Sequence, residues 1–162
     1  MKTEPVKDSG AIISRDKKYR YQLWRTWDRA ADRALFIMLN PSTADATKDD
    51  PTIRKIIGFA RRWDYGGVIV ANLFPFRSTS PALIPIRERM PNSENISHID
   101  NLILHPRVSI IVCGWGNNGT ITPDLQYWVD KGTQLFCLGT TLNGEPKHPL
   151  YVPYSQPLIL FR

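Results

Sequence analysis

Short apolar runs alternate with amphipathic stretches along most of the chain. Four of these runs have the length of strands, at 35–39, 68–71, 108–113 and 134–138. The first run contains no polar residue, which is typical of a strand that is covered on both faces. The pattern therefore predicts four strands of a buried sheet.

Three helices are expected between these strands. Their expected starts are Asp50-Pro51, Ser93 or Asn95, and Thr122-Pro123. The first helix would place five apolar side chains on one face: Ile53, Ile56, Ile57, Ala60 and Trp63. It is expected to end at Tyr65-Gly66-Gly67, where a glycine can take the left-handed conformation.

The N-terminal region has a different pattern. Stretches 11–14 and 19–27 are rich in β-forming residues and flank a polar turn, so they predict an antiparallel hairpin. In the second stretch Tyr19, Tyr21 and Leu23 alternate with Arg20, Gln22 and Trp24, the pattern of a half-buried strand at a sheet edge. A short terminal strand is expected at 158–161.

The resulting order is a hairpin followed by β-α-β-loop-α-β-α-β. This order predicts an α/β fold, a three-layer α/β/α sandwich with a mainly parallel central sheet plus the antiparallel hairpin. The proline-rich stretch 78–95 is expected to form an extended loop with a short helical turn. Residues 1–9 are expected to be a flexible tail, and residues 10–162 a single domain.

Composition narrows the class of protein. The chain has 162 residues, of which 42% are hydrophobic, so wholesale disorder is not expected. Its net charge of +6 permits a polyanionic partner such as nucleic acid but does not require one. Cys113 and Cys137 lie in apolar runs and indicate buried thiols rather than a disulfide or metal ligands. With no apolar run of membrane-spanning length, we expect a cytoplasmic protein without a membrane partner.

Polar residues follow each of the four predicted strands. The clusters are Asn40-Pro41-Ser42, Asn72-Leu73-Phe74, Gly114-Trp115-Gly116-Asn117, and Gly139-Thr140-Thr141 leading to His148-Pro149. If the strands are parallel, all four clusters lie along one edge of the sheet, where open α/β sheets bind ligands. This repeated placement makes that edge the leading candidate site.

The side chains at this edge suit a heterocyclic ligand. Asn40 and Asn72 each offer a donor and an acceptor, although an asparagine at a strand end also commonly bonds nearby backbone. His148 is a candidate for transferring a proton or stabilising negative charge, and the alternative is a surface histidine in a proline-rich turn. Phe74 and Trp115 are candidates for stacking on a base, against a simple core role.

Other chemistries are less favoured. Asp49 and Asp50 could bind a metal ion, but Asp50 is also suited to cap the first helix and Asp49 to lie in solvent. No metal is therefore expected. Arg54, Arg61 and Arg62 fit a solvated helix face, with phosphate contact as the alternative. The sequence carries no nucleotide-binding or nucleophile fingerprint, and no cofactor is expected.

Several motifs together resemble domain-of-unknown-function family 1643, which occurs in bacteria and their phages. They are Tyr19-Arg20-Tyr21, Leu39 to Asp45, Asp49 to Arg54, Asn72-Leu73-Phe74, Gly114-Trp115-Gly116 and His148 to Tyr151. The resemblance spans about residues 10 to 152.

A more distant resemblance is to the uracil-DNA glycosylase superfamily, whose fold is a three-layer α/β sandwich. Leu39-Asn40-Pro41-Ser42 resembles its water-positioning motif, Asn72 its base-reading asparagine, and His148-Pro149 its C-terminal segment that supports the leaving base. Ser42 stands where the mismatch-specific branch has glycine, and His148-Pro149 lacks the continuation that wedges into DNA.

These resemblances imply a nucleic-acid or nucleotide base-handling protein, leaning towards an N-glycosylase-like hydrolase. Asn40 and His148 would then be catalytic, with Pro41, Ser42, Asn72, Phe74, Trp115 and Asn117 binding the substrate. A flipped base would be the substrate if the protein acts on DNA. The alternatives are a non-catalytic base-binding module and a phage or defence-related inhibitor that binds a protein partner.

Overall fold

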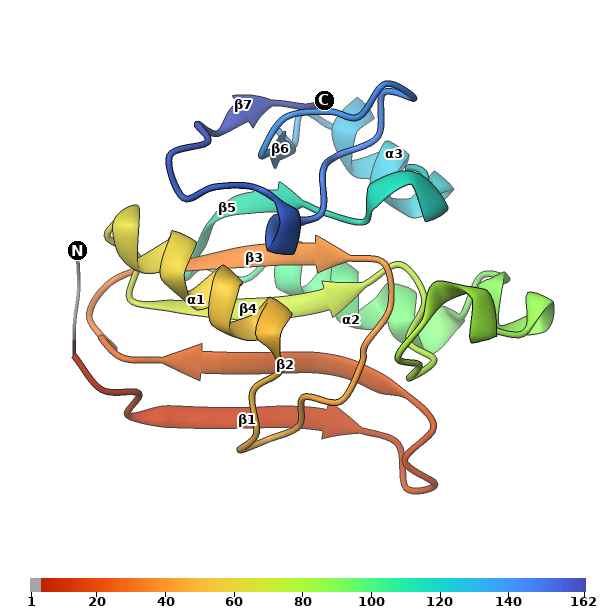
Figure 1. Cartoon of the computed structure of the whole chain (residues 1–162), viewed down its shortest axis with the longest axis horizontal. Coiled ribbons are helices and arrows are strands. Elements are labelled where there is room, and N and C mark those ends of the chain that lie inside the picture. Colours follow the sequence, from red (N-terminus) through yellow and green to blue (C-terminus); the bar gives the residue numbers. More distant parts are fainter. Residues whose placement is uncertain (1–3) are drawn as a thin grey trace.

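The sheet runs through the middle of the molecule and carries helices on both faces (Figure 1). The computed structural model describes residues 4–162, and within them the sheet has seven strands in the order β1-β2-β4-β3-β5-β6-β7. Their bounds are β1 Asp8–Ile13, β2 Arg20–Thr26, β3 Arg33–Met38, β4 Gly67–Asn72, β5 Val108–Cys113, β6 Phe136–Cys137 and β7 Ile159–Leu160.

The predicted parallel sheet is correct only for the centre. Strands β4, β3, β5 and β6 are parallel neighbours, whereas β1, β2 and β7 join by antiparallel pairing. The sheet is therefore mixed rather than mainly parallel. The predicted tail of residues 1–9 extends too far, because β1 begins at Asp8. Residues 1–3 of that tail lie outside the described residues.

The three α-helices of the described residues cover the two faces of the sheet. In Figure 1 helix α1 (Pro51–Arg62) lies in front of the sheet, and the fainter α2 (Ser93–Ile103) lies behind it. Residues of α1 share one buried cluster with β3 and β4, while residues of α2 and of α3 (Pro123–Asp130) belong to a second cluster. Alternate residues of β3 enter the two clusters, which explains its unbroken apolar run.

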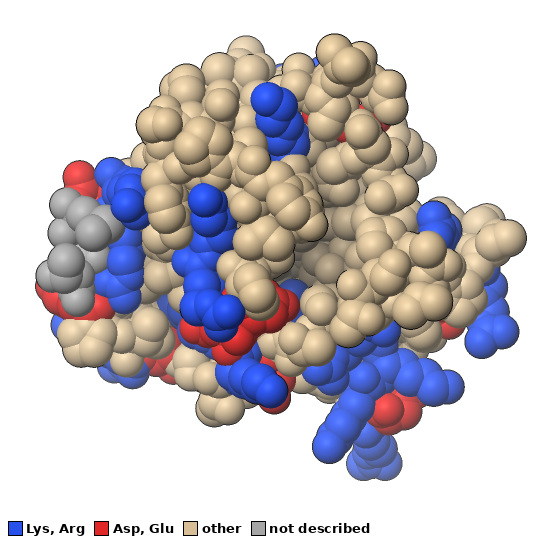
Figure 2. All heavy atoms as spheres, in the orientation of Figure 1, with Lys and Arg blue, Asp and Glu red and all other residues tan. Residues whose placement is uncertain are grey.

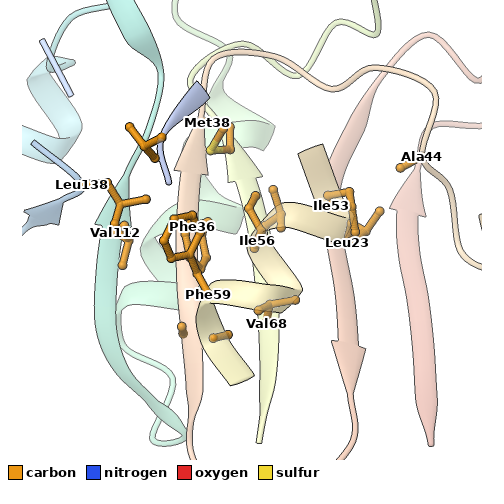
Figure 3. Packing of buried hydrophobic residues seen from close by; sticks show 14 of the residues in the cluster. Leu23, Phe36, Met38, Ala44, Ile53, Ile56, Phe59, Val68, Val112 and Leu138 are labelled. Carbon is orange, nitrogen blue, oxygen red and sulfur yellow. The ribbon is translucent and has the colours of Figure 1, made fainter. Parts of the chain in front are cut away.

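The first cluster holds α1 against the sheet. Figure 3 shows Phe36 of β3 beside Phe59 of α1, with Ile53 and Ile56 nearer the start of the helix. The Asp50 carboxylate caps this start, since its Oδ1 accepts a hydrogen bond of 2.9 Å from the Ile53 amide. The packing and the cap together fix where α1 begins.

Two predicted helix boundaries were wrong in detail. Helix α1 ends at Arg62, and the left-handed residue that follows it is Asp64, with a φ of 61°, and not Gly66. Aspartate tolerates this region better than most residues. Helix α2 is capped by Asn92, whose side chain accepts from the Asn95 amide, rather than by Ser93 or Asn95.

Strand β2 contains an extra residue that breaks its alternation. Ile12 of β1 pairs with Gln22, but Ile13 pairs with Arg20, so Tyr21 has no partner on β1. Such a β-bulge changes the face to which the following side chains point. Arg20 is consequently buried and not on the polar face with Gln22, and β1 rather than β2 forms the sheet edge.

The proline-rich loop agrees more closely with its prediction than the sheet does. The proline-rich segment after β4 contains two short 3-10 helices, at Pro81–Leu83 and Ile86–Arg89. Two others occur at Gly116–Asn118 and Pro149–Tyr151. Among residues 4–162, no helix combines the length and apolar character needed to span a bilayer.

Candidate functional site

A pocket of about 890 Å³ opens at the carboxyl ends of the parallel strands. It is bounded by the ends of β3 and β4, the start of α1, and the segments around Trp115 and His148. Figure 2 shows a hollow on this face of the molecule. Strand β3 has β4, the next strand along the chain, on one side and β5 on the other. The pocket therefore lies at the topological switch point of the sheet, where consecutive connections go to opposite sides of one strand.

Asn72 ends β4 and supplies the pocket with an unpaired amide. Only 1% of the residue is exposed, and neither its Nδ2 nor its Oδ1 has a hydrogen-bond partner among the described residues. Its backbone is fixed, because the Asn95 side chain donates a 2.8 Å hydrogen bond to the Asn72 carbonyl. An unsatisfied buried amide is costly, so Asn72 is suited to a ligand that both accepts and donates.

Asn40 offers the pocket an acceptor. Its Nδ2 donates to the carbonyl oxygens of Pro41, at 3.1 Å, and Ser78, at 2.9 Å. Two carbonyl partners identify that atom as the nitrogen and use both of its hydrogens. The Asn40 nitrogen thus bonds to nearby backbone, which was the alternative to a ligand-binding role. The Oδ1 atom of Asn40 remains available to a ligand.

His148 presents a donor in its neutral form. The half-buried ring accepts a 3.2 Å hydrogen bond at Nδ1 from the Leu150 amide, which leaves the proton on Nε2. Burial lowers the pKa of His148, and the nearby Asp50 carboxylate acts in the opposite direction. Because His148 lines the pocket, a neutral imidazole is available there near neutral pH.

Arg20 is the member of the site that the sequence pattern misplaced. It lines the pocket with 2% of the residue exposed, and its Nη1 donates to the Ala44 carbonyl at 3.0 Å. Its Nε has no hydrogen-bond partner among the described residues. Burial lowers the pKa of Arg20 to about 10, so the guanidinium is still charged at neutral pH. The Tyr19-Arg20-Tyr21 motif was the only sequence signal that could have singled it out.

Not every predicted binding residue reaches the pocket. Pro41 is buried outside the lining, and Phe74 lines a separate pocket of about 430 Å³. Trp115 contacts the pocket but is a core residue, with Nε1 bonded to Glu145 and its ring edge-on to Phe161. Its buried position does not favour the predicted stacking on a base.

The remaining two predicted residues do line the main pocket. Ser42 is half-buried there beside Asn40. Asn117 borders both pockets, and its Oδ1 accepts a 2.6 Å hydrogen bond from the Thr141 hydroxyl. The lining therefore contains Asn40, Ser42, Asn72, Trp115, Asn117 and His148 of the predicted set.

The acidic pair before α1 has structural roles. Asp50 caps the helix and also lines the pocket. Asp49 is not merely solvated, because it forms a 2.8 Å ion pair with Arg25. Among residues 4–162, no group of three or more His, Cys, Asp or Glu side chains is arranged to hold a metal ion.

Two of the helix arginines considered for phosphate contact lie against aromatic rings. The Arg61 guanidinium is 4.3 Å from the ring centre of Trp27, and that of Arg62 is 3.8 Å from Tyr154. Neither residue lines the main pocket.

Comparison with known protein families gives one match. The family described as "Protein of unknown function (DUF1643)" matches residues 20–150. Neither the search of curated proteins nor the search of solved structures found a match. The matched segment includes Arg20, Asn40, Asn72 and His148 and covers most of the chain. The chain therefore belongs to the DUF1643 family.

Proposed function

We propose that this protein binds a nucleobase in the main pocket and hydrolyses its N-glycosidic bond. The unpaired amide of Asn72 is the observation that carries this proposal. A buried amide with a free donor and a free acceptor matches a base edge on which a carbonyl and an N–H are adjacent. Reading such an edge would satisfy both atoms of the side chain.

The chemistry follows from the two other polar side chains. Asn40 Oδ1 would accept a hydrogen bond from water and hold it near the sugar carbon, since an amide cannot act as a general base. The water oxygen bonds to that carbon as the carbon–nitrogen bond breaks, and its proton passes to solvent. The bonding electron pair leaves with the base, where His148 Nε2–H would donate a hydrogen bond to the developing negative charge.

The arrangement of the fold supports the same proposal. Four parallel strands lie between α1 on one face and α2 and α3 on the other, which fits a three-layer, uracil-DNA glycosylase-like sandwich. The pocket lies at the strand ends expected for that fold. The likeness is proposed from topology and motifs together.

The surface near the site fits a nucleic-acid substrate. Figure 2 shows Lys and Arg side chains gathered over the turn that joins β1 to β2. Arg15, Lys17 and Lys18 are exposed in that turn, and Arg77 is attached to it by hydrogen bonds to the Lys17 and Lys18 carbonyls. Such a cluster suits contacts to a phosphate backbone.

The test is cleavage of oligonucleotides that contain uracil, hypoxanthine or another modified base, followed by alkali. The wild-type protein is expected to produce strand scission at the modified base. Asn40→Ala is expected to lower the rate by about 100-fold, the size seen when one transition-state hydrogen bond is lost. Asn101→Ala, which changes an exposed asparagine of α2, is the matched control and should leave the rate unchanged.

Two other results would contradict hydrolysis. Tight binding of these oligonucleotides without scission would favour a base-binding module. Capture of a protein partner that is unaffected by Asn40→Ala and Asn72→Ala would favour an interaction role.

A further inference from the structure

Arg20 is a buried cation whose burial outweighs the attraction of the Asp50 carboxylate, so that its pKa is lowered. It makes no ion pair among residues 4–162, and Nε is left without a hydrogen-bond partner. Only a backbone carbonyl, that of Ala44, accepts from Nη1. A buried charged group is unfavourable unless its hydrogen bonds are made, so the free Nε–H of Arg20 favours a negatively charged acceptor on a ligand in the pocket.

The fold gives Arg20 this position through the bulge at Tyr21. Tyr21 and Gln22 both reach the α2 side of the sheet, where the Tyr21 ring stacks on His98 and Gln22 bonds to the same ring. Arg20 instead points to the α1 side, towards Ala44 and the pocket. A regular strand would have placed Arg20 on the same face as Gln22.

Arg20 also lies beside the strand that carries the unpaired amide. β2 is the antiparallel neighbour of β4, and the Arg20 amide bonds to the Pro75 carbonyl just beyond the end of β4. Asn72 and Arg20 therefore line one pocket from adjacent strands. Together they offer a neutral donor, a neutral acceptor and a charged donor, none of which has a hydrogen-bond partner in the part of the chain that the structure describes.

We propose that Arg20 binds a negatively charged oxygen of a planar heterocycle, so that the pocket prefers an ionised base over its neutral form. This inference rests on the proposed function, because it takes the pocket ligand to be a base. A charge-assisted hydrogen bond from a guanidinium is stronger than one between neutral groups. In the hydrolytic reaction the same contact would stabilise the departing base anion.

Asp50 argues against phosphate as the charged group. Its carboxylate is buried, lines the same pocket and already caps the start of α1. It would repel a doubly charged phosphate more strongly than a single charge spread over a ring. The other charged or titratable side chains of the lining are Lys147, His148 and Tyr151. The charge of Asp50 raises the pKa of Arg20, whereas the charges of Arg77 and Arg25 lower it.

The test compares two small probes in calorimetric binding. 6-Azauracil loses a proton near neutral pH, whereas uracil stays neutral until clearly alkaline pH. Binding of both is measured well below and well above the pKa of 6-azauracil, where that probe is almost wholly neutral or almost wholly ionised and Arg20, with its pKa of about 10, remains charged. Uracil reports any effect of protein groups such as His148.

We expect the wild-type protein to bind 6-azauracil about tenfold more tightly above its pKa, the size of one hydrogen bond to a charged group. Uracil should show no such preference. Arg20→Gln should remove the preference, Arg20→Lys should keep part of it, and Arg29→Gln, at an exposed arginine outside the pocket, should keep all of it.

Three other outcomes are distinguishable, and each contradicts a different part of the proposals. Equal binding of both forms of 6-azauracil by the wild-type protein overturns this inference alone, and this result does not depend on any variant folding. Tighter binding of orthophosphate that is lost in Arg20→Gln overturns the assignment to a heterocycle. Binding of neither base overturns the proposed function together with this inference.

Discussion

Two arginines of β2 are equally buried and have opposite surroundings. Arg20 and Arg25 are each 2% exposed. Arg25 donates from Nε to Asp49 at 2.8 Å, from Nη1 to the Trp24 carbonyl at 2.8 Å and from Nη2 to the Asp45 carbonyl at 2.6 Å. Within residues 4–162, the Arg20 side chain has one carbonyl partner and an unpaired Nε at the pocket.

The difference separates a structural cation from one that is prepared for a ligand. Arg25 fastens β2 to the loop before α1, and its hydrogen bonds are completed within the protein. Arg20 carries the same charge on the same strand but leaves bonding capacity unused. Burial of a charged side chain therefore says little about its role until its partners have been counted.

The largest expected effect is on stability. Arg25→Met should lower the free energy of unfolding by about 3 kcal/mol, because Asp49 and several backbone carbonyls lose their partner. Arg20→Met should lower it by less than about 1 kcal/mol, since it removes a buried cation that forms no ion pair within residues 4–162. Urea denaturation followed by circular dichroism measures both. Equal losses would show that Arg20 is as structural as Arg25.

A second pair extends the comparison to neutral side chains. Asn95→Ala should cost about 2 kcal/mol, because it frees the buried carbonyls of Asn72 and Leu73. Asn72→Ala breaks no side-chain hydrogen bond within the described residues and should cost less than about 1 kcal/mol. The same denaturation experiment applies to both variants. A larger loss for Asn72→Ala would contradict the role of that amide in ligand binding.

The smallest effect concerns pH. Burial lowers the pKa of His148 below its ordinary value of 6.5, so the unfolded chain binds a proton more readily than the folded one. Stability should therefore be complete above that value and decrease as the pH falls through it. His148→Gln should weaken this dependence in thermal unfolding measured across that range. An unchanged profile would mean that another group causes the decrease.

The sequence predicted the parts of the molecule whose pattern is local. The apolar run of β3, the Asp50-Pro51 start of α1 and the hairpin were all recognisable from spacing and capping residues. The parallel strands then brought Asn40, Asn72 and His148 into the lining of one pocket, as expected for polar residues at strand ends.

Features that depend on tertiary contacts were not predictable in the same way. The left-handed conformation of Asp64 after α1 and the burial of Trp115 could not be read from the spacing of apolar and polar residues. Phe74 follows a strand end as Asn72 does, but lines the neighbouring pocket instead. The burial of Arg20 in the pocket was not predicted, because the alternation rule assumes a strand without an extra residue.

The bulge at Tyr21 makes the charge of the pocket depend on the register of β2 as well as on residue identity. If β2 alternated regularly through Tyr21, Arg20 would lie on the same face as Gln22, away from the pocket, without any change of residue. A relative that keeps these three residues but pairs them without a bulge would have an electrically different pocket. Alignments of this strand should therefore be judged by register before residue types are compared.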